Sequence, residues 1–156
     1  MMPARQIYTL RGIADDMKQV LTRRGIPFLY DETGLVGRGK VSLSGKELPL
    51  TVGIDPAKCI LTLTLGLPVT FVQADTGVAA QAACRINDSL TAGCVELHDG
   101  AVSVRASLFF RESQLAAAAL LDLFELSLMI AETHWDALRR LSLREISLEQ
   151  FAAALR

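Results

Sequence analysis

The residues of this 156-residue chain that could do chemistry are few, and none stands in a catalytic pattern. The three cysteines lack the CxxC spacing of metal and redox sites, and no serine stands in a GxSxG turn. Of the two histidines, His98 lies four residues from Cys94 on one predicted strand face, too far to share a metal ion with it. We expect the other, His134, to be a partly exposed imidazole at a packing edge. The sequence therefore predicts no catalytic nucleophile, no metal site and no cofactor.

A glycine-rich segment, residues 34–41, comes close to a phosphate-binding loop. In such loops the glycines let backbone amides surround a phosphate, and a lysine, here Lys40, contacts its far end. Val41, however, stands where a Ser or Thr must reach magnesium, and the next residues alternate as a strand instead of opening a helix. We therefore expect a glycine-softened bend among strands and no nucleotide site.

Carboxylates are the remaining source of acid–base chemistry. Their close pairs, for example Asp122 with Glu125, are accounted for as solvated helix faces or as turn formers. None of these pairs predicts a reaction, and we therefore predict that the chain is not an enzyme. An enzyme whose site is assembled from scattered carboxylates is kept as the third-ranked alternative.

Composition and charge narrow the classes of partner. Apolar residues make up 51% of the chain against 21% charged, and the mean hydropathy is +0.33, which indicates apolar surface left over for a partner. A net charge of −1 provides no field that would collect nucleic acid or anionic lipid. The longest apolar stretch, Leu115 to Ala131, is cut by Asp122 and Glu125, so no membrane span is expected. A cytoplasmic protein with reduced cysteines is the default.

Hydrophobic periodicity predicts a helix and then strands in the first half of the chain. Apolar residues recur at the spacing of one helical face over residues 10–21, with Thr9 as a possible N-cap and Gly25 as the stop. Phe28 to Tyr30 makes a short strand, and from Val41 onward the period changes to two. The buried phase of the last alternating run is expected to be Cys59, Leu61, Leu63 and Leu65. These runs predict an antiparallel meander with one face on a core.

The second half returns to helices around one hairpin. Asp99-Gly100 joins two strand-like runs and suits a type I′ turn, because both of its residues need positive φ. The helical segments are residues 75–90, a long helix from about Ser113 to Leu141, and a short last helix that starts at a capping box, Ser147 to Gln150. With no linker and no internal repeat, we predict one α+β domain over residues 1–156.

The long helix is the most informative element. Its polar residues fall in one narrow stripe, and one of its two apolar flanks has the alternating three and four steps of a packing seam: Leu121, Phe124, Leu128, Ala131, Trp135 and Leu138. Covering one sheet face needs only one stripe, so the second must pack on the chain's own first or last helix, or on a second copy or a client. We predict a homodimer, with Leu121, Phe124, Leu128 and Trp135 as candidate partner-binding residues.

Several short runs in the second half form a series: Ala82 to Asn87 with Leu90, Cys94 to Leu97, the Asp99-Gly100 turn, Val102 to Phe109, and Trp135 to Leu138 before a short closing helix. In this series the chain from Ala79 onward resembles the YbjN family, described as bacterial sensory-transduction regulators and similar in fold to the type III secretion chaperones. The first half shares with them only the order of its elements. The resemblance implies a twisted antiparallel sheet flanked by helices, in the order α-β-β-β-(β)-α-β-β-α-α.

The resemblance also implies a function. A protein of the YbjN type would bind a polypeptide or dimerise and has no catalytic residues to carry over, so a non-catalytic regulatory, protein-binding domain ranks first. The alternative is a type III secretion chaperone, which would hold an extended client along the sheet and helices of a dimer. Such chaperones tend to be distinctly acidic, whereas this chain is nearly neutral, and the chaperone therefore ranks second.

Overall fold

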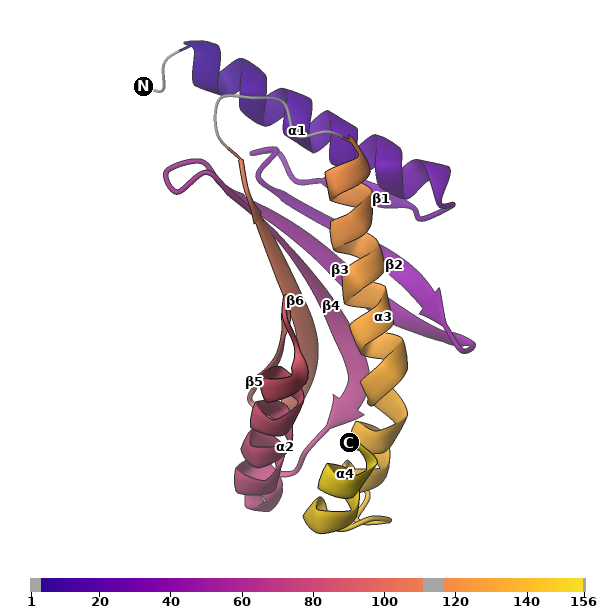
Figure 1. Cartoon of the computed structure of the whole chain (residues 1–156). Helices are drawn as coiled ribbons and strands as arrows, with labels where there is room; N and C mark the ends of the chain where they lie inside the picture. The colour runs from indigo at the N-terminus through magenta and orange to yellow at the C-terminus, as the bar shows by residue number, and fades with distance from the viewer. Residues whose placement is uncertain (1–3, 111–116, 156) are drawn as a thin grey trace.

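The computed structural model describes residues 4–110 and 117–155 and contains a sheet of six antiparallel strands with its helices on one side (Figure 1). In chain order the elements are α1 (Ala4–Arg23), β1 (Phe28–Tyr30), β2 (Val36–Leu43), β3 (Lys46–Asp55), β4 (Ile60–Thr70), a 3₁₀ turn (Gln73–Asp75), α2 (Thr76–Ser89), β5 (Cys94–His98), β6 (Ala101–Phe109), α3 (Ala117–Ser142) and α4 (Leu148–Ala154). Across the sheet the strand order is β1-β2-β3-β4-β6-β5. The predicted α+β class and the element order are confirmed.

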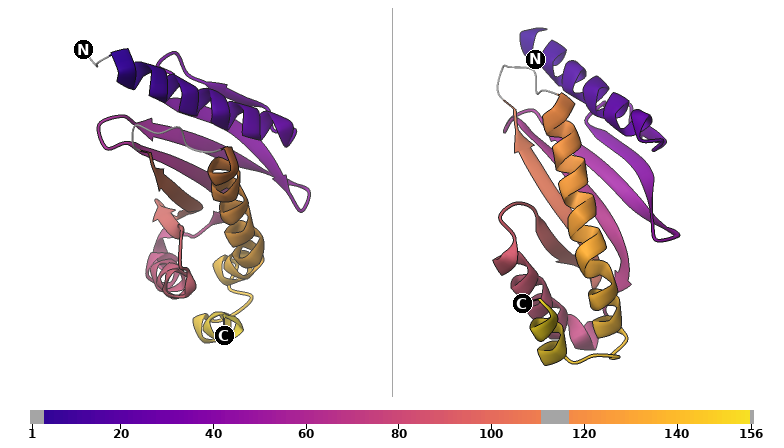
Figure 2. Two further views of the ribbon diagram at one scale, coloured as in Figure 1. Left: turned by 45° about the horizontal axis from the view of Figure 1, so that its top comes forward. Right: turned by 45° about the vertical axis from the view of Figure 1, so that its right-hand side comes forward.

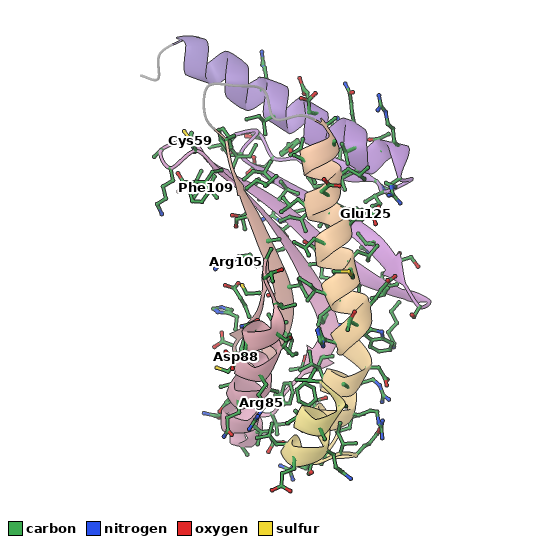
Figure 3. All side chains as sticks on the ribbon, in the orientation of Figure 1. Cys59, Arg85, Asp88, Arg105, Phe109 and Glu125 are labelled. Atoms are coloured by element: carbon green, nitrogen blue, oxygen red, sulfur yellow. The ribbon has the colours of Figure 1, made fainter. Side chains whose placement is uncertain are left out.

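The sheet has one buried and one open face because apolar and polar residues alternate along its strands. Leu61, Leu63 and Leu65 are fully buried on the helix side, as predicted, and α3 crosses this side over β4 and β6 (Figure 2). On the other side Thr64 stands in register with Arg105, which projects from β6 away from the helices (Figure 3). The helices of the described residues all leave this polar face uncovered (Figure 2).

Two predictions about element ends are wrong. Thr9 lies inside α1, which begins at Ala4, because the preceding residues include the good helix formers alanine, arginine and glutamine. Cys59 lies in the turn before β4 with a φ of 54°, and its thiol points to the carbonyl of Pro56 at 3.7 Å. This turn is held by Asp55, whose carboxylate accepts the N–H groups of two residues after Pro56. Cys59, which the alternating pattern assigned to the buried face of the strand, therefore belongs to the turn.

The long helix is confirmed over most of its length. Its predicted start at Ser113 lies outside the described residues, and α3 is seen from Ala117 to Ser142. It lies across the middle of the sheet, with α1 beside its first turns (Figure 1). Among the described helices, none combines the length and the apolar character needed to cross a membrane.

The C-terminal segment is anchored at two points. Ser147 and Gln150 form the predicted capping box, with each side chain accepting the other residue's backbone N–H at 3.2 and 2.8 Å. Phe151 of α4 is fully buried. Ahead of the box, the Arg144 guanidinium donates to both carboxylate oxygens of Asp75 at 3.0 and 3.1 Å. These contacts hold α4 against the start of α2.

His134 is buried, with 7% of its surface exposed, whereas the sequence predicted partial exposure. Burial lowers the pKa of the His134 imidazole, because the charged form loses its hydration.

His134 should make the stability of the protein depend on pH. The unfolded chain takes up a proton at this imidazole near pH 6.5, whereas the folded chain resists it, so the free energy of unfolding should fall as the pH drops below about 6.5. We expect the melting temperature to decline between pH 7.5 and 5.5, and less steeply in His134→Leu. Parallel pH profiles would contradict this assignment.

Candidate binding groove

A groove of about 460 Å³ lies between α3 and the outer edge of β2. Its walls are the loop of residues 24–27, β2 residues 39–42 with Glu47 beside them, and Phe124 and Leu128 of α3. Phe124 is 2% exposed, so the floor is the protein's own apolar core. A larger hollow of about 630 Å³ lies between α1 and the β1–β2 turn, but many of its lining residues are charged. The smaller groove is therefore the better apolar binding surface.

The groove exists because the chain that follows α1 joins the sheet only at Phe28. Gly25 has a φ of 72° and ends α1 in a Schellman motif, in which the N–H groups of Gly25 and Ile26 donate to the carbonyls of Thr22 and Leu21 at 3.0 Å. This motif turns the chain at the end of α1, and residues 24–27 do not pair with β2. As a result β1 pairs with β2 only at residues 37–39.

The edge of β2 beyond this pairing carries free backbone groups. β2 and β3 are joined by the two-residue turn Ser44-Gly45, which fixes Leu43 and Lys46 as a hydrogen-bonded pair, and bonding alternates from there. The N–H and C=O of Ser42 therefore point away from β3, and no backbone bond from another described loop reaches them. The C=O of Lys40 points the same way toward Pro27, which has no N–H to donate. One donor and two acceptors are thus open beside the groove.

The charged side chains at the groove pair with one another. Arg24 of the loop forms an ion pair with Glu125 of α3, which projects from the helix in Figure 3. Lys40 and Glu47 form a second pair across β2 and β3 at 3.1 Å. The Lys40–Glu47 pair is largely solvated and adds little to stability, whereas in the Arg24–Glu125 pair the contacting Oε1 of Glu125 is buried. Together the two pairs leave the groove without a net charge, so its selectivity rests on apolar contact and backbone bonds.

The four candidate partner-binding residues divide between two places. Phe124 and Leu128 line the groove, whereas Leu121 and Trp135 do not and lie along the same flank of α3, partly buried. The alternate members of the predicted seam, Phe124, Ala131 and Leu138, are buried inside the chain at 2% exposure or less. The flank therefore consists of two rows of residues. One row is buried in the core, and the other, which contains Leu121, Leu128 and Trp135 at seven-residue intervals, stays partly exposed.

Groups that could do catalysis do not converge in the part of the chain that the structure describes. The side chain of His98 is 93% exposed at the β5–β6 turn, and the carboxylate of Glu96 is paired with Arg105 at 2.9 Å on the open face. The three cysteines are free thiols. No cluster of three or more histidine, cysteine or carboxylate residues within residues 4–110 and 117–155 could hold a metal ion.

Sequence reasoning missed the edge that completes the groove. The predicted bend in the glycine-rich segment is wrong, because Gly37 and Gly39 lie inside β2 and make room for β1. A Cβ on Gly37 would stand 2.1 Å from the ring of Phe28, which packs over these glycines. The detectable signal was the combination of Gly25 with Pro27, which marks a helix stop followed by a residue that cannot extend a strand ladder.

Comparisons with known proteins agree on the fold. No family model and no curated protein matches this sequence. Among solved structures, the chain is similar to YbjN, a candidate transcription regulator from E. coli, with 11% identity and a TM-score of 0.56 over 85% of this chain and 92% of that one. It is also similar to a chain of the HopA1-SchA chaperone-effector complex, with 16% identity and a TM-score of 0.52 over 83% and 95% of the two chains. A chain of the ExsC-ExsE complex gives 18% identity and a TM-score of 0.50 over 83% and 92%. The fold is therefore the one seen in YbjN and in the matched chains of these two complexes.

Proposed function

We propose that this chain is a non-catalytic, cytoplasmic protein-binding domain that takes up an extended segment of another polypeptide in the groove at the β2 edge. The observation that carries the proposal is the free N–H and C=O of Ser42 beside an apolar floor. Similarity in fold to YbjN and to chaperones solved with partner proteins supports a protein as the ligand. We rank a regulatory role of the YbjN type first and a secretion-chaperone role second.

The chemistry of the groove matches a strand that adds to a sheet edge. An added segment would accept from the Ser42 N–H and donate to the carbonyls of Lys40 and Ser42, so the main chain supplies part of the affinity. Alternate side chains of the segment would point to the helix side, where Val41, Phe124 and Leu128 are found. Since the charges at the rim pair with one another, the segment needs apolar residues at those positions and no fixed charge.

Ser42→Pro tests this proposal because it removes the free N–H without touching α3. Proline is tolerated at a strand edge, and the Ser42 side chain lies exposed on the open face. Linear peptides selected from a random phage library against the folded protein provide the ligand. We expect Ser42→Pro to weaken their binding about tenfold or more in fluorescence anisotropy, since one hydrogen bond and a strand contact are lost.

The matched control is Ser42→Ala, which keeps the backbone N–H and should bind within about twofold of the wild type. Circular dichroism should show both variants folded. In the wild-type complex the Ser42 amide should exchange more slowly than in the free protein. Equal affinity of Ser42→Pro and Ser42→Ala for every selected peptide would contradict strand addition at this edge.

A second copy of the chain is the other occupant that we propose, on the flank of α3. Leu121, Leu128 and Trp135 stay partly exposed at seven-residue intervals, which places them in one row along this flank of the helix. An apolar strip of this kind on a helix is typical of a packing seam between two chains. We therefore propose a homodimer through this flank.

A further inference from the structure

The second edge of the sheet is β5, and its outward backbone groups can be assigned from the adjoining hairpin. Asp99 and Gly100 have φ values of 48° and 83°, so the two-residue turn makes His98 and Ala101 a hydrogen-bonded pair. Bonding to β6 then recurs at every second residue of β5. The N–H and C=O of Val95, like those of Leu97, consequently point away from the sheet, as those of Ser42 do at the opposite side.

A side chain makes hydrogen bonds to the outward N–H and C=O of Val95. Asn87, in the last turn of α2, accepts the Val95 N–H at its Oδ1 at 2.7 Å and donates from its Nδ2 to the Val95 carbonyl at 3.0 Å. A carboxamide that makes both bonds presents the same donor and acceptor as a residue of a neighbouring strand. Unpaired strand edges attract other chains, and proteins cover them for that reason.

The two edges of the sheet are thus treated differently. Ser42 is free and borders an apolar groove, whereas Val95 is bonded to Asn87 and borders α2. We infer that Asn87 closes the β5 edge to strand addition at Val95, so that an extended partner is taken up at the β2 edge and not at β5. The direction of this selectivity rests on the proposed function, but the closure of β5 by Asn87 can be tested without any client.

Asn87→Ala removes both bonds, and Asn87→Asp keeps an acceptor for the Val95 N–H while losing the donor to its carbonyl. In peptide-free protein we expect amide hydrogen exchange at Val95 to accelerate about tenfold or more in Asn87→Ala and to stay within about threefold of the wild type in Asn87→Asp. The amide of Glu96, which bonds to β6, should change in neither variant. Fast exchange at Val95 in the wild type, or unchanged exchange in Asn87→Ala, would overturn the assignment.

Self-association separates edge closure from a local structural role. A second copy of the chain is the occupant we expect at an opened β5 edge, so Asn87→Ala should gain mass relative to the wild type in light scattering as its concentration rises. The Val95 amide should regain protection in the associated form, because a partner strand then bonds it. A variant that keeps the wild-type mass up to about millimolar concentration, with Val95 exchanging fast throughout, would show that Asn87 does not guard the edge. Failure to select any peptide would remove the proposed function and leave these results standing.

Discussion

Gly100→Ala should destabilise the protein by roughly 2–4 kcal/mol and lower its melting temperature by roughly 5–15 °C. Gly100 has a φ of 83°, which an alanine adopts only at a cost, and a Cβ at this position would stand 2.3 Å from the carbonyl oxygen of Phe71. That carbonyl belongs to backbone and cannot rotate away. Phe71 also donates its N–H to the Gly100 carbonyl at 2.8 Å, so the clash falls on the contact that joins the β5–β6 hairpin to the end of β4.

Gly45→Ala is the matched control for this effect. Gly45 has a φ of 76° in the same kind of two-residue hairpin turn, but nothing lies within 4 Å of a Cβ built there. It should therefore show only the conformational cost, about 1–2 kcal/mol. Thermal unfolding of the three proteins in parallel measures both terms. Equal losses of stability in the two variants would contradict this prediction, because they would mean that Phe71 moves away from the new Cβ and that its carbonyl adds no steric cost.

The elements of this fold could be predicted from sequence because each is specified by its own periodicity. Leu61, Leu63 and Leu65 follow the period of a strand, and Asp99-Gly100 is a local signal for its hairpin. Periodicity fails at Cys59, because this residue continues the apolar alternation by type and spacing but lies in a turn. The turn that contains Cys59 is held by the hydrogen bonds of Asp55, which an alternating pattern of apolar residues cannot reveal.

The groove could not be predicted in the same way, because it depends on what is absent at one strand edge. β1 begins only at Phe28, opposite Gly39, and this late start follows from the Schellman motif at Gly25 together with Pro27. Local patterns indicate these two residues as a helix stop and a turn. They do not indicate that the freed edge of β2 lies next to Leu128, nearly ninety residues later in the chain. That neighbourhood is a property of the fold.

The glycines of β2 show how one pattern can have two physical causes. Gly37 and Gly39 belong to the segment 34–41 that resembles a phosphate-binding loop, and Lys40 follows them. In the structure the missing side chains are needed by a neighbour, since the ring of Phe28 fills the space above both and stacks edge-on against Tyr30 at 5.0 Å. The same glycines therefore serve close packing of β1 on β2, and the function of this region comes from the edge beyond them.

Leu128→Asp should convert the proposed homodimer into a folded monomer, with the mass measured by light scattering falling by half. An apolar side chain of this size contributes roughly 1.5–3 kcal/mol when buried, and an aspartate that replaces it must lose its hydration at the interface. Because a symmetric dimer carries the substitution in both copies, the total loss of at least about 3 kcal/mol corresponds to at least about a hundredfold weaker association. Leu126→Asp is the control, because Leu126 is also partly buried but lies on the other flank of α3. It should leave the mass unchanged.

The same substitution separates a partner copy from intramolecular packing. If the chain's own helices covered Leu128, the aspartate would lower the melting temperature without changing the mass. A wild-type protein that runs as a monomer across micromolar concentrations would contradict the proposed dimer.

Leu128 belongs to both proposed binding surfaces. Because it also lines the groove at β2, a peptide bound beside Ser42 and a second copy on α3 would both contact this side chain. We therefore expect a groove-binding peptide to dissociate the dimer, which would make client uptake and self-association mutually exclusive states of this surface.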